Sequence, residues 1–365
     1  MHVAADLRVL DREGMEHTGL GRSALEVARA LPAVRPEWTF TIHSNRSDLF
    51  AEKTGVTLCT TRWPTASALG RAAWLLTAGR RDDPSPDLWW APTYYLPRGW
   101  RGPGVVTIHD LVFVLQPQLY RGRLKALYAA RVAGESARRA DRVLCPSVAT
   151  RERVVREFRV DAAKVVVARW GVDEAFRGAP PSAKREYALF VGRWEARKGL
   201  DVLHAALREA ARRGSRIRLV LAGGPGWGAG ETVRRLRAEP DVDVVLEPSD
   251  ERLRSLYAGA LALVYPSRME GFGLPVAEAM AAGCPVISSD LPEIREWAQD
   301  APRYVPVGDE HALAEALITL AENPSRRERI VEHGREVAQG LTWAACAEAT
   351  AQAMESAAAE RSARP

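Results

Sequence analysis

Short runs of β-branched and apolar residues alternate with helical patterns through most of the chain, and this alternation restricts the fold more than any other feature. Strands that alternate with helices form parallel sheets covered by helices, so the sequence predicts an α/β fold. In the first half the predicted strands are Leu7–Leu10, Phe40–His43, Leu88–Ala91, Val105–His109 and Val143–Cys145.

A second series follows the turn-rich segment 177–184, where we place the domain boundary. Its predicted strands are Ala188–Val191, Arg218–Ala222, Val242–Leu246, Ala262–Tyr265 and Val286–Ser288, with helices that begin near Gly199, Glu231, Asp250 and Pro275. Two such series predict two doubly wound, Rossmann-like domains, at 1–175 and 186–340, with a ligand site between them. The segment 341–365 is predicted to be a helix that can cross back to the first domain.

Composition narrows the class of protein. The chain has 365 residues, 47% hydrophobic and 27% charged, which suits a folded protein with two cores. Its four cysteines form no close pair of the kind used for zinc or redox chemistry, which favours a reducing compartment. No secretion signal and no apolar run near the roughly 20 residues of a membrane span is present, so we expect a cytoplasmic protein. The net charge of +5 favours anionic partners without choosing among them.

One stretch of the second half combines a strand, a loop, a helix signal and another strand. From Leu261 it is LALVYPSRMEGFGLPVAEAMAAGCPVISSD, a βαβ unit. Pro275 suits a first helical turn and Gly283 suits a stop, which predicts a helix over 274–282. The turn Gly271-Phe272-Gly273 precedes Leu274. Its amides and the helix dipole predict an anion site that fits a diphosphate.

Glu270 and Glu278 bracket this turn, and both carboxylates can face one pocket. Glu278 can accept hydrogen bonds from a ribose diol, and Glu270 can bind sugar hydroxyls or face a cation that develops at the reacting carbon. The alternative is structural: Glu278 would be a solvated helix residue and Glu270 a loop charge.

The whole block resembles the signature of the family 4 glycosyltransferases, a retaining group with the GT-B fold, in which two glutamates flank a Gly-Phe-Gly-Leu-Pro turn. The likeness extends in the family's order to FVGRWEARKGL (190–200), LVLAGGPGW (219–227) and LRSLYAGA (253–260). It implies two facing Rossmann-like domains with an interdomain cleft, a nucleotide diphosphate sugar as donor, and a saccharide or glycolipid acceptor. Donor-binding positions then include Gly192, residues 271–274 and Glu278.

The resemblance gives Arg193 and Lys198 a role that basic loop residues would not otherwise suggest, since exposed Arg and Lys are common. In the family, the matching positions bind the donor's diphosphate and neutralise charge on the departing nucleotide. The resemblance implies front-face displacement, and nothing in the sequence predicts the closely spaced pair of carboxylates that retaining hydrolases use. We expect no metal or other cofactor. Asp241-Val242-Asp243 has the Asp-x-Asp pattern of some metal sites, but we interpret it as the solvated start of a strand.

The first half contributes two further motifs. Gly19-Leu20-Gly21 precedes a predicted helix over Ser23–Leu31, and in the family a similar glycine loop faces the donor. A tight structural turn is the alternative. His109 and Asp110 follow a predicted strand, where a side chain can enter a site, although the two can also pair structurally. Several family members carry this Thr-Ile-His-Asp-Leu run with the histidine beside the donor sugar, and most of those are mannosyltransferases, which points to GDP-mannose.

Other readings stay open from the sequence. Members often carry a glycine and an aromatic residue where this chain has Leu246-Glu247-Pro248, so the base is not defined. A nucleotide-sugar epimerase of the same architecture, or a non-catalytic partner subunit, is an alternative function. No nucleic acid partner is expected. The basic segment 121–139 is either a solvated helix face or a peripheral contact with a membrane that holds a lipid-linked acceptor.

Overall fold

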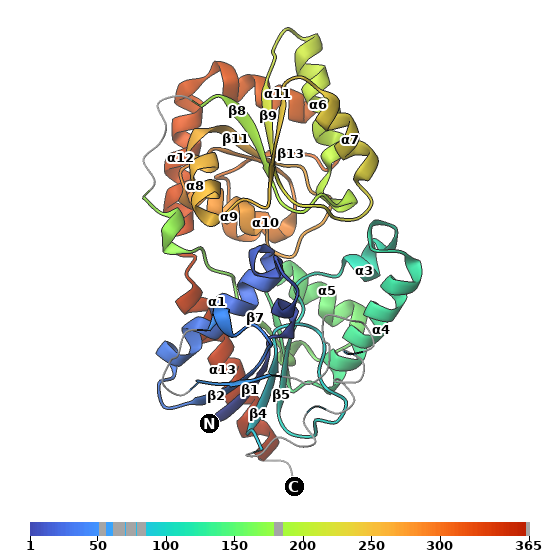
Figure 1. The fold of residues 1–365 in the computed structure, drawn as a ribbon, viewed down its shortest axis with the longest axis vertical. Helices are drawn as coiled ribbons and strands as arrows, with labels where there is room; N and C mark the ends of the chain where they lie inside the picture. Colours follow the sequence, from blue (N-terminus) through green and yellow to red (C-terminus); the bar gives the residue numbers. More distant parts are fainter. Residues whose placement is uncertain (51–55, 61–69, 71–77, 79–84, 179–184, 363–365) are drawn as a thin grey trace. The chain divides into compact units, whose positions relative to one another are not determined.

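The computed structural model describes residues 1–50, 56–60, 70, 78, 85–178 and 185–362. The chain divides into two compact units, whose segments can be followed in Figure 1 because its colours give the residue numbers. The first unit consists of Met1–Val114, Leu127–Gly171 and Trp343–Pro365, and the second of Leu115–Ala126 and Val172–Thr342. The predicted boundary segment, 177–184, lies mostly outside the described residues.

The first unit is built on a sheet whose described strands all run parallel to their neighbours. Its central strands are buried along their whole length, which explains their continuous apolar sequences. Across the sheet the order is β3 (Val56–Cys59), β2 (Thr39–His43), β1 (His2–Asp6), β4 (Leu88–Ala91), β5 (Gly104–Thr107), β6 (Arg142–Cys145) and β7 (Val165–Val167).

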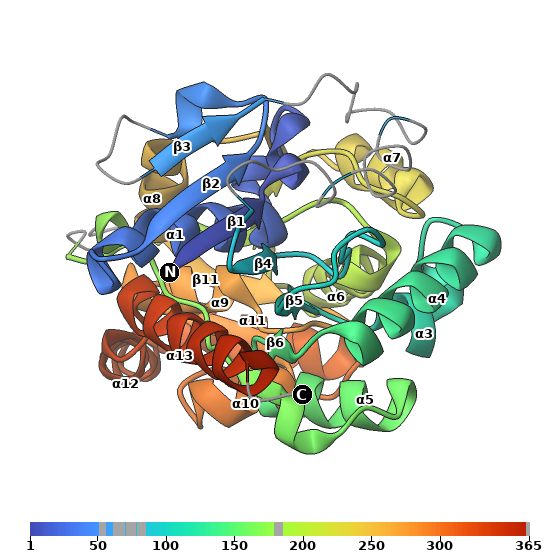
Figure 2. The same ribbon diagram turned by 90° about the horizontal axis from the view of Figure 1, so that it is seen from below.

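Helices cover this sheet, and one of them comes from the far end of the chain. The helix α13 (Trp343–Ser362) packs along α1 (Gly19–Val34) and against the strands β4, β5 and β6 (Figure 2). Most of its buried residues are small, including Ala347, Ala351 and Ala357, so the helix can lie close to the sheet. The chain also forms α3 (Val112–Leu115), α4 (Arg123–Arg139) and α5 (Val148–Phe158), and the segment Leu115–Ala126, which includes the first turn of α4, is grouped with the second unit.

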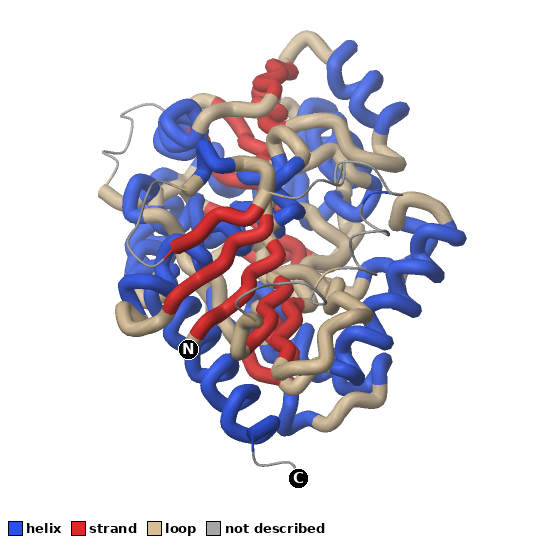
Figure 3. The backbone as a smooth tube through the Cα atoms, turned by 60° about the horizontal axis from the view of Figure 1, so that its bottom comes forward, coloured by secondary structure: helices blue, strands red, loops and turns tan. Residues whose placement is uncertain are grey.

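The second unit contains another parallel sheet, drawn in red with the first in Figure 3. The strand order is β10 (Val242–Leu246), β9 (Arg218–Gly223), β8 (Tyr187–Val191), β11 (Ala260–Tyr265), β12 (Val286–Ser289) and β13 (Arg303–Val305). The helices are α6 (Leu200–Arg212), α7 (Gly230–Ala238), α8 (Asp250–Gly259), α9 (Leu274–Ala281), α10 (Pro292–Ala298), α11 (Glu310–Glu322) and α12 (Pro324–Gln339).

Each sheet has a point where the chain reverses its direction of progress across the strands. This point lies between β1 and β4 in the first sheet and between β8 and β11 in the second. Loops leave such neighbouring strands in opposite directions, which opens a crevice at their carboxyl ends where doubly wound folds bind ligands. In the second unit, we therefore expect a site at the loops that follow β8 and β11.

The structure confirms the predicted α/β class and most strands, but the predicted strand Leu7–Leu10 is wrong. Strand β1 ends at Asp6, and Arg8–Asp11 form a 3₁₀ turn. The Asp6 carboxylate accepts two hydrogen bonds from the Arg8 guanidinium, which bends the chain back at this point. Leu7 and Leu10 are both buried. They are apolar because this turn packs them into the core, and they do not belong to a strand. The short strands β3, β7 and β13 were not predicted.

Candidate active site

Lys198 and Glu270 meet at the reversal point of the second sheet. Lys198 closes the loop that follows β8, and Glu270 lies in the loop between β11 and α9. The Lys198 ammonium donates to Glu270 Oε1 at 2.7 Å and to the Tyr265 hydroxyl at 2.8 Å. Both charged side chains are less than 10% exposed. The two loops predicted independently from the sequence thus share one buried ion pair.

Arg197 extends this pair into a network. Its guanidinium donates to Glu270 Oε2 at 3.2 Å, to the Met269 carbonyl at 3.1 Å, and to Glu195 Oε2 at 2.9 Å. Glu195 is itself buried, and its other oxygen lies 3.8 Å from Arg193 Nε. Because both oxygens of Glu270 are occupied by cations from one loop, the carboxylate is held in one orientation.

The electrostatics of the network keep Glu270 ionised. Burial alone would raise the pKa of Glu270, but the Lys198 ammonium and the Arg197 guanidinium outweigh burial and lower that pKa to about 2. Burial lowers the pKa of Lys198, against the opposing effect of Glu270. Burial also raises the pKa of Tyr265, so its hydroxyl stays neutral and can accept from Lys198.

A close backbone approach brings the two loops together. Gly199 follows Lys198 with a φ of 70°, and a Cβ there would lie 2.0 Å from the Pro266 carbonyl oxygen. Only glycine fits this position, because any side chain would push the loops apart. The Arg268 amide also donates to the Arg197 carbonyl at 2.7 Å. Main-chain contacts between the two loops, as well as charge, therefore hold Lys198 next to Glu270.

The turn before α9 has the predicted helix start, with Gly273 as the N-cap and Pro275 in the first turn. Phe272, which is predicted to contact the donor, stacks its ring on Trp297 at 4.8 Å between centroids. Trp297 Nε1 donates to the Phe272 carbonyl at 3.0 Å. Both rings are buried, so the phenylalanine anchors the turn on α10, and contact of this segment with a donor stays a prediction.

Glu278 lies on α9 and is also buried, with only 4% of the residue exposed. Its Oε2 accepts from the Tyr257 hydroxyl at 3.1 Å. Tyr257 comes from α8 and packs edge-on against Phe176. The alternative of a solvated helix residue is therefore wrong, and a binding role for Glu278 stays a prediction.

The two predicted phosphate-binding cations have different surroundings. Arg193 is more than a third exposed and donates to the Pro225 carbonyl on the loop that follows β9. Lys198 is buried against Glu270. Gly192, which precedes Arg193, donates its amide to the Ala222 carbonyl at 3.1 Å. The exposed guanidinium is thus the more accessible of the two cations.

Gly19 and Gly21 lie within the first turn of α1, so the helix begins before the predicted start at Ser23. Thr18 is the N-cap, and its hydroxyl accepts from the Gly21 amide at 3.1 Å. That amide is therefore already bonded. A Cβ at Gly21 would lie 1.9 Å from the Met15 carbonyl oxygen, so close packing of the main chain explains this glycine.

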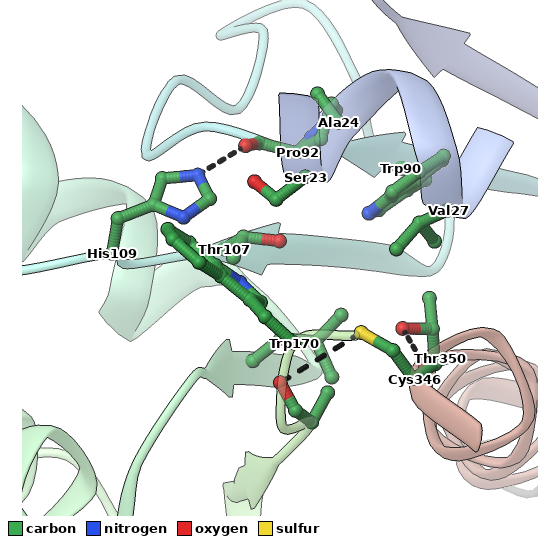
Figure 4. Close-up of a pocket in the computed structure, with 12 residues that line it drawn as sticks. Ser23, Ala24, Val27, Trp90, Pro92, Thr107, His109, Trp170, Cys346 and Thr350 are labelled. Carbon is green, nitrogen blue, oxygen red and sulfur yellow. Dashed lines mark hydrogen bonds between the residues drawn. The ribbon is translucent and has the colours of Figure 1, made fainter. Parts of the chain in front are cut away.

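His109 points into a small pocket of the first unit, lined among others by Ser23, Trp90 and Trp170 (Figure 4). Its Nε2 lies 2.7 Å from the Pro92 carbonyl, which makes Nε2 the protonated nitrogen. Burial lowers the pKa of His109, so the ring is neutral near pH 7. Asp110 does not pair with it; that carboxylate accepts from the Val112 amide at the start of α3.

Trp170 connects the predicted residues of the first unit. Its ring centroid lies 5.5 Å from that of His109, and its ring would be 3.3 Å from a Cβ on Gly19.

Sequence reasoning missed Trp170, Arg197 and Tyr265. Arg197 lies beside Lys198 in the run that resembles the family, and Tyr265 is the last residue of the strand before Glu270. Their positions just after or at a strand end could have identified both as candidate site residues.

Within the described parts of the chain, no group of three or more His, Cys, Asp and Glu side chains is placed to hold a metal ion. Asp243 is exposed and accepts from Arg218 Nε at 2.6 Å across β10 and β9. Asp241 is exposed as well.

The sequence has clear relatives. Residues 172–337 match the family model described as glycosyl transferases group 1, and residues 17–176 match the one described as Glycosyltransferase Family 4. A D-inositol 3-phosphate glycosyltransferase from Kineococcus radiotolerans is 33% identical over 305 residues, which are 73% of this chain and 70% of that protein. The chain belongs to the family 4 glycosyltransferases.

Other similarities agree with this assignment. The O-antigen chain mannosyltransferase B of Escherichia coli is 28% identical to this glycosyltransferase over 92% of the chain and 95% of that protein. The crystal structure of WaaG, a glycosyltransferase involved in lipopolysaccharide biosynthesis, superposes with a TM-score of 0.74 at 17% identity, over 96% of this chain and 98% of WaaG. The two Rossmann-like halves of this glycosyltransferase therefore have the GT-B fold.

Proposed function

We propose that this glycosyltransferase is a retaining hexosyltransferase that moves mannose from GDP-mannose to a saccharide, lipid-linked or small-molecule acceptor. The observation that carries the proposal is the buried Lys198–Glu270 pair beside the amino end of α9. Similarity to an O-antigen chain mannosyltransferase over nearly the full length supports mannose as the sugar.

In the proposed complex, the donor's two phosphates rest against the amino end of α9 and contact Lys198 and Arg193. A helix start supplies main-chain amides and a positive dipole end, which suit a diphosphate. Glu270 has two functions here. It keeps Lys198 charged and oriented, and its own negative charge faces the cationic sugar carbon of the transition state. Glu278 binds the ribose hydroxyls.

The proposed reaction is a front-face displacement. The bond between the sugar's anomeric carbon and the diphosphate oxygen breaks, and the acceptor oxygen bonds to that carbon on the same face. The acceptor's proton passes to the departing phosphate, so the products are GDP and a glycoside with the donor's anomeric configuration. The cations and amides stabilise the leaving charge, and we propose that no metal ion is needed.

A nucleotide-sugar screen tests the donor. Thermal shifts with GDP-mannose and with UDP-, ADP- and dTDP-sugars rank the donors, because a ligand that binds only the folded state raises stability with its concentration. We expect the largest shift with GDP-mannose and little shift in Lys198→Ala. A larger shift with another base would overturn the donor assignment. Proton NMR of the product then reports the anomeric configuration.

A small phosphorylated polyol is a second candidate acceptor. It is favoured by the relative named as a D-inositol 3-phosphate glycosyltransferase, which has the higher identity of the two relatives above. Turnover of GDP-mannose with inositol 3-phosphate and with mannose-terminated oligosaccharides, measured side by side, separates the candidates. GDP release with the oligosaccharides alone supports a saccharide acceptor.

A further inference from the structure

The helix α4 carries large apolar side chains on its outer side. Leu124 is 84% exposed, Leu127 is 68% exposed and Tyr128 is 55% exposed. The two leucines are the most exposed large apolar residues in the described parts of the chain. Positions three and four apart on a helix lie on one face, so these three side chains form a single apolar surface.

The opposite side of α4 already makes the contacts that a helix needs for packing. Ala126, Ala129, Ala133 and Ala137 are each at most 2% exposed and repeat at helical spacing. The alanines therefore form the buried side of α4, and the leucines and the tyrosine lie on its exposed side. Grouped exposed apolar side chains, in contrast to isolated ones, mark a surface that contacts something else.

The charged residues around this apolar surface are mostly basic. The helix has five basic side chains and one acidic side chain, Glu135, which pairs with Arg98. Arg123, Lys125 and Arg131 are exposed and have no ion-pair partner among the described residues. Arg131 lies seven residues after Leu124 on the same face. We define the α4 face as these three basic residues with Leu124, Leu127 and Tyr128.

We propose that the α4 face binds the surface of an anionic lipid membrane. Its apolar side chains would enter the boundary between headgroups and acyl chains, and its basic side chains would contact anionic headgroups. Contact is at the surface, because no helix among the described residues is long and apolar enough to cross a bilayer. Charge argues against a second copy as occupant, since pairing two such faces would bring like charges together. The inference is independent of the proposed donor.

Vesicle co-sedimentation of the full chain tests the proposal without any nucleotide. We expect binding to vesicles of equimolar phosphatidylcholine and phosphatidylglycerol, weak binding to phosphatidylcholine alone, and loss of binding in high salt. The double variant Arg123→Gln with Lys125→Gln should bind about 30-fold more weakly, given the usual contribution of each basic residue near an anionic surface. Leu124→Ser with Leu127→Ser should weaken binding by at least about tenfold.

A matched double variant removes one exposed apolar and one exposed basic side chain elsewhere, Val307→Ser with Arg216→Gln. It should bind as the wild type does. Equal binding by the α4 variants, with unchanged melting temperatures, would overturn the proposal. So would absence of binding to anionic vesicles, or a concentration-dependent dimer in sedimentation velocity that the leucine variant abolishes.

Discussion

Lys198 Nζ lies 2.7 Å from Glu270 Oε1, and both side chains are buried where the loops after β8 and β11 meet. A buried pair of this kind is sensitive to the loss of either partner, because the other charge is then left without compensation. Each variant at these two positions therefore needs a melting temperature beside its activity or binding measurement, so that an effect on folding is recognised.

Glu270→Gln should lower turnover by about two to three orders of magnitude, the usual cost of one preorganised stabilising group. The amide keeps the shape of the carboxylate and loses its charge. Steady-state kinetics with the donor at saturation checks this expectation. Glu315→Gln removes an exposed acid that pairs with Arg213, and it should leave turnover unchanged. Normal turnover in Glu270→Gln would remove Glu270 from the reaction.

Lys198→Ala should weaken nucleotide binding by about 1.5–3 kcal/mol, the contribution of a hydrogen bond to a charged group. Arg193→Ala should have a smaller effect, because its side chain is partly exposed and solvent screens its charge. Isothermal calorimetry with GDP measures both. An affinity for GDP that is the same in Lys198→Ala and in the wild type contradicts phosphate contact by this residue.

Arg197→Met should move the acid limb of the pH profile of kcat/KM to higher pH. Arg197 is one of the two cations that lower the pKa of Glu270, so its removal raises that pKa toward the ordinary value and neutralises Glu270 at less acidic pH. Arg197→Lys should restore part of the shift. An unmoved acid limb in Arg197→Met would show that Arg197 only anchors the Met269 carbonyl.

Folding stability should depend on Glu270 in a defined pH window. The pKa of Glu270 is lowered on folding from 4.5 to about 2, so its contribution to stability is complete above pH 4.5 and is lost as pH falls toward 2. The difference in free energy of unfolding between wild type and Glu270→Gln should therefore shrink by about 1.4 kcal/mol per pH unit below 4.5. Urea unfolding at several pH values measures it. A constant difference would contradict the ionised pair.

Gly21→Ala should destabilise the first unit by about 2–3 kcal/mol, since its Cβ would overlap the Met15 carbonyl. Gly19→Ala should cost less, because the nearest neighbour is the Trp170 ring at 3.3 Å. Thermal unfolding compares the two. Equal melting temperatures for Gly21→Ala and wild type would contradict the packing explanation of this glycine.

The sequence predicted the fold class and the position of the α9 turn because both follow from local patterns. The strands β4 and β10 were predicted to the residue, as continuous apolar or alternating runs bounded by breakers. Leu7–Leu10 failed because an ion pair between Asp6 and Arg8 bends the chain, and periodicity does not report such a pair.

Predicting the site from sequence was less complete. Lys198 and Glu270 were each identified, but their contact joins residues 72 positions apart, and no local pattern gives that distance. The burial of Phe272 against Trp297 depends in the same way on how α10 packs. Roles in donor binding and catalysis stay predictions for all these residues.

A crystal structure with bound GDP tests the central claim most directly. We expect both phosphates within hydrogen-bond distance, about 3 Å, of the main-chain amides at the start of α9 and of Lys198 Nζ. Phosphates bound at another place, with Lys198 still in contact only with Glu270 and Tyr265, would contradict it.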